Sequence, residues 1–261
     1  MPSIMDKMGC QSYTFNQFPV FEAIELCAKS GAKVIEFYPG QRLGKDFTGG
    51  LDRDSPKQVI KAVVDACSAN GVRPVAFGVD SLGQDQGKNR KLFDFVKALG
   101  AESITSEPDV TAMDLIEALV KEYDLKVSIH NHPVSPSNPN YKFWDPKYVL
   151  SLVKNRDARL GSCADTGHWV RSNIKPVEAL RILQGRIHGS HLKDLNKFGP
   201  GATAVPYGNG VSDIGAILDE FARQKYTGHF SVEYEINGRG PVEAVGQCIG
   251  YAKGYCAGRK I

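Results

Sequence analysis

Short β-branched runs alternate with longer amphipathic segments along the whole chain, and this alternation constrains the fold more than any other feature. The strand-like runs cover residues 8–13, 33–37, 73–77, 103–106, 126–131, 160–164, 186–191 and 229–233. Between them, apolar residues recur at helical spacing, for example in segments 20–31, 55–71, 89–100 and 111–124. Eight such units in 261 residues match the size of one closed parallel barrel. We therefore predict an α/β fold, a single (β/α)8 TIM barrel over residues 1–261.

Turn and loop signals agree with this prediction. Gly31, Gly71 and Gly100 follow helical segments, where a left-handed glycine commonly ends a helix. No Gly-x-Gly-x-x-Gly turn follows the first strand, which argues against an open dinucleotide-binding sheet. The connections at residues 133–144 and 196–212 are long, and loops of that length often serve as lids or binding loops.

The composition favours a globular protein that acts on a small molecule. Hydrophobic residues make up 42% of the chain, enough to fill one large core. The net charge of +3 forms no block of Lys and Arg, so neither a nucleic-acid nor a membrane partner is expected. The sequence shows no apolar leader and no membrane span, and no C-x-x-C pair occurs among its cysteines. These features predict a cytoplasmic protein in a reducing compartment.

Four residues with metal-binding side chains each end a strand-like run. They are His130 in SIHNH, Asp165 in CADTGH, His191 in GSHLKD and Glu233 in VEYE. The C-terminal ends of the strands meet at one rim of a barrel, so these side chains would converge. Imidazole nitrogens and carboxylate oxygens bind Mn, Co, Zn or Fe. A single histidine at a strand end is usually structural, but four such residues on neighbouring strands predict one divalent metal ion as cofactor.

Two residues next to these ligands carry further predictions. His168 lies three residues after Asp165 and can be a ligand, a partner of a ligand or a contact to a substrate oxygen, of which we favour the last. Lys193 lies two residues after His191, on the same side of the strand end, where its ammonium can hold an anionic substrate oxygen. The alternative for Lys193 is an ion pair with the adjacent Asp194.

Acidic residues at the ends of two earlier strands are candidates for proton transfer. Glu36 ends VIEF in the second strand-like run, and Glu107 ends SITSE in the fourth. A desolvated carboxylate is a useful base near neutral pH. Glu36 is the better candidate because it directly follows a buried run, whereas Glu107 precedes Pro108 and can instead cap the next helix.

Several residues near the same rim are candidates for substrate binding. Aromatic walls with a few polar groups suit the apolar face of a sugar. We expect substrate contacts from His132, Trp169, Tyr38 and Glu107.

Four motifs resemble those of the xylose-isomerase-like TIM-barrel superfamily, the sugar (phosphate) isomerase/epimerase family. They are ADTGHW at 164–169, HLKD at 191–194, YGNGVSD at 207–213 and SVEYE at 231–235, and the resemblance covers essentially the whole chain. It implies that Asp165, His191 and Glu233 bind a divalent cation and that His168 contacts substrate. It also implies that the barrel forms homo-oligomers.

One position departs from the pattern of that family. Its epimerases usually carry a glutamate at the end of the fifth strand, often in Glu-Asn-His, which serves as metal ligand and transfers a proton. The matching run here is His130-Asn131-His132. A shuttle between two opposed glutamates is therefore not expected. A metal and one main base remain, which suit aldose–ketose isomerisation or elimination next to a carbonyl.

The leading hypothesis is a divalent-metal-dependent sugar or keto-sugar isomerase or epimerase. The cation would chelate a carbonyl and a neighbouring hydroxyl, and Glu233 or Glu36 would take the α-proton to give an enediolate. Expulsion of a β-oxygen would instead make the protein a lyase or hydratase that removes water or an alcohol from a keto-sugar or keto-glycoside. Remote alternatives are an endonuclease-like phosphodiesterase, which needs further His and Glu ligands on the early strands, and a non-catalytic sugar-binding barrel.

Overall fold

Eight parallel strands form a closed barrel in the computed structural model, which describes residues 4–44, 46–235 and 242–261. The strands follow the order β1, β12, β9, β8, β7, β6, β5, β2 around the barrel. Their bounds are β1 Met8–Gln11, β2 Val34–Phe37, β5 Arg73–Asp80, β6 Ser103–Ser106, β7 Lys126–His130, β8 Leu160–Asp165, β9 Ile187–Leu192 and β12 His229–Val232. The predicted barrel is confirmed.

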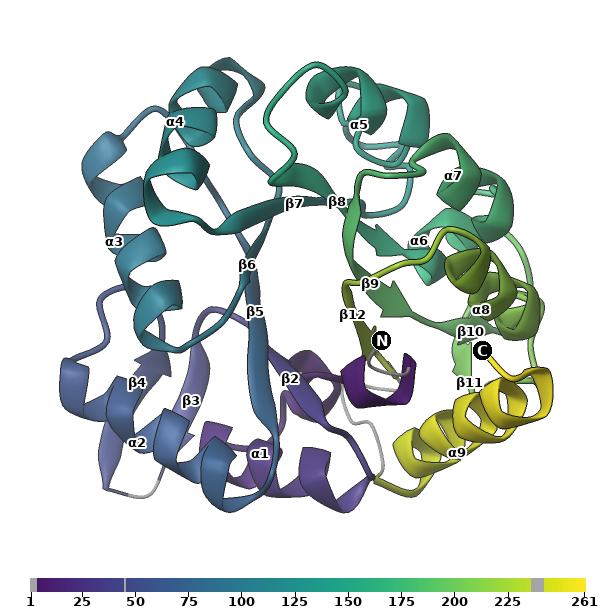
Figure 1. The fold of residues 1–261 in the computed structure, drawn as a ribbon, viewed down its shortest axis with the longest axis horizontal. Helices are drawn as coiled ribbons and strands as arrows, with labels where there is room; N and C mark the ends of the chain where they lie inside the picture. Colours follow the sequence, from purple (N-terminus) through teal and green to yellow (C-terminus); the bar gives the residue numbers. More distant parts are fainter. Residues whose placement is uncertain (1–3, 45, 236–241) are drawn as a thin grey trace.

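Helices cover the outside of the barrel as a ring, which Figure 1 shows. They are α1 Val20–Lys29, α2 Lys57–Ala69, α3 Gln86–Ala98, α4 Met113–Tyr123, α5 Pro146–Val153, α6 Thr166–Arg171, α7 Pro176–Ile182, α8 Ile214–Arg223 and α9 Val242–Arg259. The last helix, α9, packs against both α1 and α8, so the two ends of the chain close the ring side by side. In the described part of the chain, no helix is both long and apolar enough to cross a bilayer.

The observed strands agree with the predicted runs to within a few residues. The largest differences are at β1, which already ends at Gln11, and at β5, which continues to Asp80. The helix ends agree too, because the glycines predicted to be left-handed have positive φ: Gly31 at 91°, Gly71 at 66° and Gly100 at 73°.

Two antiparallel strand pairs lie in the connections, and the strand pattern does not predict them. β3 Gln41–Gly44 pairs with β4 Phe47–Leu51, and β10 Asp194–Leu195 pairs with β11 Ala204–Val205. Beside the second pair, the Asp194 carboxylate accepts hydrogen bonds from the backbone N–H groups of Gly208, Gly210 and Ser212, at 2.9, 3.0 and 3.1 Å. Asp194 therefore anchors the long loop and does not pair with Lys193.

The barrel interior is polar near the C-terminal ends of the strands. Glu36, Thr105, Asp165 and Ser231 are fully buried there, beneath the rim where the strands end. The cysteines are all buried free thiols, as the sequence predicts. Buried polar groups normally need hydrogen-bond partners, so the contacts of this polar layer indicate what the rim does.

Candidate metal centre and substrate cavity

The four predicted ligands lie together at the C-terminal rim of the barrel. His130 and Asp165 are the last residues of β7 and β8, His191 lies near the end of β9, and Glu233 directly follows β12. The strand register aligns them, since Asp165 and Ser231 both pair with His191. Alternate residues of a strand point to the same side, so Glu233 follows Ser231 into the barrel mouth.

The side-chain atoms of these residues face one another closely. His130 Nε2 lies 3.5 Å from Asp165 Oδ2, and His191 Nδ1 lies 3.8 Å from the same oxygen. Glu233 Oε2 lies 3.0 Å from His191 Nδ1. One ligand atom from each of His130, Asp165 and His191 lies within 4.8 Å of the other two. All four side chains are buried, so their donors are held away from bulk water.

Three of these atoms have no hydrogen-bond partner. Asp165 Oδ2, His191 Nδ1 and Glu233 Oε2 are buried without one. The Lys193 ammonium lies 3.1 Å from both oxygens, and Glu233 Oε2 lies 3.0 Å from His191 Nδ1. These ion pairs offset part of the about 1–3 kcal/mol that a buried polar atom without a hydrogen bond costs. Imidazole and carboxylate donors fit a divalent ion such as Mn, Co, Zn or Fe. The residues present therefore fit the predicted cofactor.

Local contacts orient Asp165 so that its Oδ2 faces His130 and His191. Its Oδ1 accepts the His168 backbone N–H at 2.8 Å and caps α6. The Asn131 side chain accepts from the Asp165 N–H at 2.9 Å and donates to its carbonyl at 3.0 Å. Asn131 is a site residue that the sequence patterns miss, because an asparagine after a strand gives no signal until its partner is known.

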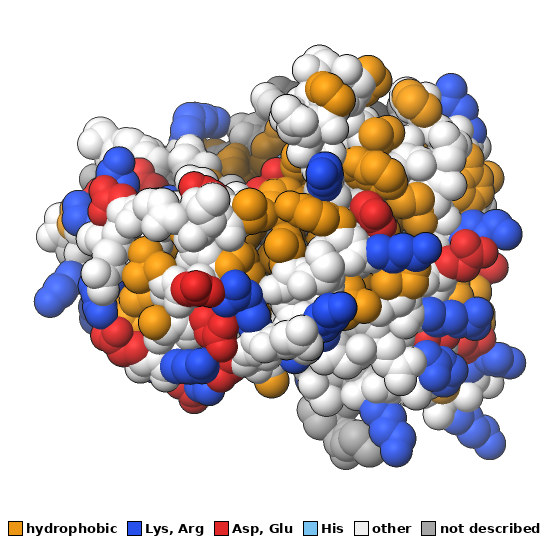
Figure 2. Space-filling model, turned by 90° about the horizontal axis from the view of Figure 1, so that it is seen from above, with side chains coloured by type: hydrophobic (Ala, Val, Ile, Leu, Met, Phe, Trp, Pro, Cys, Tyr) orange, Lys and Arg blue, Asp and Glu red, His pale blue; other side chains and the backbone are white. Residues whose placement is uncertain are grey.

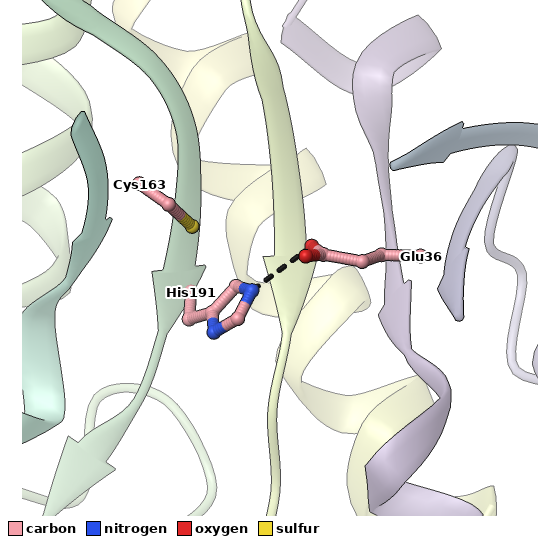
Figure 3. A group of neighbouring side chains, drawn as sticks. All are labelled: Glu36, Cys163 and His191. Atoms are coloured by element: carbon pink, nitrogen blue, oxygen red, sulfur yellow. Dashed lines mark hydrogen bonds and ion pairs between the residues drawn. The ribbon is translucent and has the colours of Figure 1, made fainter. Parts of the chain in front are cut away.

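Glu36 lies below the ligands, inside the barrel. Its Oε2 accepts from Ser231 Oγ at 2.8 Å and lies 2.9 Å from His191 Nε2, and its Oε1 accepts from Thr105 Oγ1 at 2.6 Å. Figure 3 shows the Glu36 carboxylate and the His191 ring pointing toward each other. Burial raises the pKa of Glu36, but His191 and His229 outweigh it and hold the pKa well below its usual range.

These contacts give Glu36 an orienting role. An ionised carboxylate next to Nε2 keeps the proton on that nitrogen, which leaves Nδ1 of His191 as the ligand atom. Glu36 does not line the cavity above the ligands. The role of Glu36 in proton transfer from a substrate stays a prediction.

Cys163 is the third residue of the group in Figure 3, on the neighbouring strand β8. Its sulfur lies within 4.8 Å of the ligand atoms of Glu36 and His191. Burial raises the pKa of this thiol to about 11. In the structure Cys163 packs as a small buried side chain beside His191.

Lys193 lies behind the ligands with its ammonium fully buried. Its Nζ lies 3.1 Å from Asp165 Oδ2, 3.1 Å from Glu233 Oε2 and 3.3 Å from Glu235 Oε2. Burial lowers the pKa of Lys193, but these carboxylates outweigh it and hold the pKa above its usual value. The side chain does not line the cavity, and the contact to an anionic substrate oxygen stays a prediction.

Glu107 connects both histidines of the His-Asn-His run. Its Oε1 contacts His132 Nδ1, accepts from Tyr141 Oη at 2.6 Å and lies 3.6 Å from His130 Nδ1. Burial raises the pKa of Glu107, but its hydrogen-bond partners lower it below the usual range. A charged Glu107 therefore favours a proton on Nδ1 of His132 and leaves Nε2 of that ring as an acceptor. Tyr141 comes from the long loop 133–144, and no sequence signal marks it.

A cavity of about 360 Å³ opens beside the ligands. Its walls are formed by Gln11, Tyr13, Tyr38, Pro39, Gly78, Val79, His130, His132, His168, His191, Glu233 and Glu235. Tyr13 and Tyr38 meet edge to face, with ring centroids 5.1 Å apart. This volume and mixture of aromatic and polar walls suit a small sugar.

Some of the residues predicted to contact substrate line the cavity, and others do not. His132, His168 and Tyr38 line it, whereas Glu107 lies behind His132. Trp169 does not line the cavity and is only 1% exposed, because α6 directs its ring into the core. His168 Nε2 lies 3.5 Å from Asp165 Oδ2, and burial lowers its pKa well below the usual value, which keeps the ring neutral.

Comparison with known proteins agrees with this architecture. The family model described as xylose isomerase-like TIM barrel matches residues 24–251. The chain belongs to this family. A solved structure of a protein from Parabacteroides distasonis ATCC 8503, titled "Putative uncharacterized protein", is 30% identical, with a TM-score of 0.74 over 95% of this chain and 98% of that one.

More distant relatives of this xylose isomerase-like barrel carry different names. A D-tagatose 3-epimerase-like protein is 18% identical, with a TM-score of 0.75 over 96% of this chain and 97% of that chain. A protein of Bacillus anthracis titled "probable 3-DHS dehydratase" is 13% identical, with a TM-score of 0.67 over 94% and 97%. These two likenesses show the shared fold.

A curated relative in Thermotoga maritima is named "Probable endonuclease 4". It is 22% identical over 193 residues, which are 67% of this chain and 63% of that protein. This chain thus spans less than two thirds of the length of that relative, so the name of the relative does not carry over.

Proposed function

We propose that this xylose isomerase-like barrel is a divalent-metal-dependent isomerase or epimerase of a sugar or keto-sugar. One observation carries the proposal: buried imidazole and carboxylate ligand atoms converge beside a cavity that His130, His191 and Glu233 line. His130, Asp165, His191 and Glu233 would hold the ion. A bound divalent cation supplies Lewis acidity, which polarises a substrate carbonyl and makes its α-proton more acidic.

Proton transfer would fall to groups in the cavity wall. Glu233 is the carboxylate expected from the sequence and lines the cavity. His132 lines it as well, and its contact with Glu107 leaves Nε2 as the proton acceptor. A substrate carbon between these two side chains could lose its proton to one of them and regain it at the adjacent carbon, which is an isomerisation.

The second candidate is elimination of water or an alcohol from a keto-sugar or keto-glycoside. His130 has an imidazole at the position where the family's epimerases usually have a glutamate. The second carboxylate that would pass a proton back and forth in a reversible epimerisation is therefore absent at this position. One base and one acid on different sides of a substrate suffice for elimination. The fold shared with the dehydratase-titled protein agrees with this candidate.

A phosphodiesterase activity has less support. Glu107, His130 and His132 do form a second group with ligand atoms within 4.8 Å. However, Glu107 Oε1 already accepts from Tyr141, unlike Asp165 Oδ2 and Glu233 Oε2, which accept no hydrogen bond. The net charge of the chain is only +3, and on the side of the molecule that Figure 2 shows, basic and acidic side chains are interspersed, which gives no support for a nucleic-acid partner.

The proposal is tested by proton NMR in D2O with metal-stripped protein and with the same protein loaded with Mn, Co or Zn. The substrates are ketoses, ketose phosphates and 3-keto-glucosides. We expect metal-dependent deuterium uptake with an isomeric product. Metal-dependent loss of water or aglycone would instead establish the elimination. No change in the NMR spectrum of any of these substrates would reject both candidates for them.

Variants separate the metal ligands from the proton-transfer groups. Asp165→Asn should lose its metal equivalent and all activity, because it removes a charged ligand that no other group replaces. His132→Gln should keep the metal and lose turnover by about 10²–10⁴-fold if this ring transfers the proton. Metal analysis after gel filtration provides the first readout. A full metal equivalent in Asp165→Asn would reject the site assignment.

A further inference from the structure

Lys193 brings a positive charge to two of the proposed metal ligands. Its Nζ lies 3.1 Å from Asp165 Oδ2 and 3.1 Å from Glu233 Oε2, so the ammonium forms ion pairs with both oxygens. A divalent ion held by these oxygens would therefore have the ammonium as a direct neighbour. The side chain is completely buried, so water screens this pair of like charges poorly.

The packing around Lys193 fixes the ammonium in this position. Its aliphatic chain lies against Gly167, where an added Cβ would come within 2.6 Å of Lys193 Cβ. Its backbone N–H donates to Thr166 Oγ1 at 3.1 Å. On the far side, Glu235 contacts the ammonium and is itself held by Arg171 at 3.1 Å. Residues of α6, together with Glu235 after the end of β12, therefore fix the position of the Lys193 ammonium.

We infer that Lys193 sets both the metal affinity and the net charge of this centre. The inference rests on the proposed metal site and goes beyond it. The ammonium makes the charge of the loaded centre one unit more positive than it would be without Lys193, while Glu36 beside His191 and Glu235 beside Lys193 add negative charge around it. Lys193 thus weakens metal binding by repulsion and makes the centre more favourable for an oxyanion derived from the substrate.

Lys193→Met tests this inference, because methionine keeps the length of the side chain and removes its charge. Lys197→Met is the matched control, since Lys197 is exposed four residues away. The three proteins are stripped with EDTA and titrated with Mn²⁺ by calorimetry. We expect Lys193→Met to bind Mn²⁺ at least about tenfold more tightly than wild type, whereas Lys197→Met stays unchanged.

A gain in affinity is a result that structural damage does not produce. Equal or weaker Mn²⁺ binding by a folded Lys193→Met protein, with normal binding by wild type, would overturn the role of Lys193 and leave the proposed function intact. Failure of all three proteins to bind Mn²⁺, Co²⁺ or Zn²⁺ would reject the metal centre itself. Circular dichroism in EDTA checks folding, and Lys193→Gln replaces Lys193→Met if the latter does not fold.

Discussion

At the scale of single residues, the same chemical group serves different purposes according to its partners. Glu233 and Glu36 are both glutamates at strand ends, yet Glu233 Oε2 has no hydrogen-bond partner and Glu36 accepts from several donors. Glu233 forms ion pairs with Lys193 and His191 and lines the cavity, where its oxygen is available to a metal or a proton. A carboxylate whose oxygens are occupied instead fixes its neighbours, here His191.

The variant Glu36→Gln tests this distinction. Glutamine keeps the shape of the side chain but loses the charge that holds the proton on His191 Nε2. We expect the protein to fold and its metal affinity to fall by about 10–100-fold, as is usual when the partner of a ligand is removed. The exposed Glu178→Gln is a suitable control for the loss of one charge. Unchanged metal affinity with lost turnover would instead support the role in proton transfer that the sequence predicts.

At the scale of elements, a buried carboxylate joins the neighbouring helices α7 and α8. Glu220 of α8 is 3% exposed and accepts from Arg181 Nε of α7 at 3.1 Å, from Arg223 and from Gln224 at 2.7 Å. Its pKa is lowered to about 2, chiefly by the hydrogen bond from Arg223. These helices lie between β8 and β12 in the chain, on the side of the barrel that supplies Asp165 and Glu233.

We therefore expect Glu220 to make stability depend on pH. A carboxyl group whose pKa is lowered by folding stabilises the protein above its unfolded pKa of about 4.5, and this contribution is lost as the pH falls toward about 2. Glu220→Gln should be less stable than wild type by about 1–2 kcal/mol at pH 7. Urea denaturation at pH 7, 4 and 3 measures the difference, which should shrink with falling pH. A difference that grows in acid would contradict this account.

At the scale of the whole molecule, the barrel brings together residues that are far apart in the chain. The proposed ligands come from four strands, β7, β8, β9 and the end of β12, which are neighbours around the barrel. A metal bound there would link these strands to one another. Because the ligands are close only in the folded barrel, metal binding should stabilise the entire domain.

This predicts a metal-dependent melting temperature. At a free metal concentration one hundred times the Kd, the folded state gains about 2.7 kcal/mol, which corresponds to a rise in Tm of about 5–10 °C for a chain of this size. Differential scanning fluorimetry with Mn²⁺, Co²⁺, Zn²⁺ and EDTA measures the shift. Asp165→Asn is the control, and its melting temperature should not respond to metal. An equal shift in both proteins would place the bound ion elsewhere.

The sequence by itself determines the barrel, because strand and helix periodicities are local properties of the chain. It also places His130, Asp165, His191 and Glu233 at strand ends, and the C-terminal ends of parallel strands in a barrel necessarily share one rim. Homo-oligomer formation and a cytoplasmic location stay predictions from the sequence.

Only the tertiary structure decides which side chains reach the cavity. Like the ligands, Glu36, Lys193 and Trp169 lie at or just after strand ends in the sequence. In the structure, however, each is buried and does not line the cavity. Conversely, Asn131 and Tyr141 act through contacts with Asp165 and Glu107 that are distant along the chain. Hydrogen-bond partners and burial depend on the packing of several strands and loops at once, and a linear pattern does not contain that information.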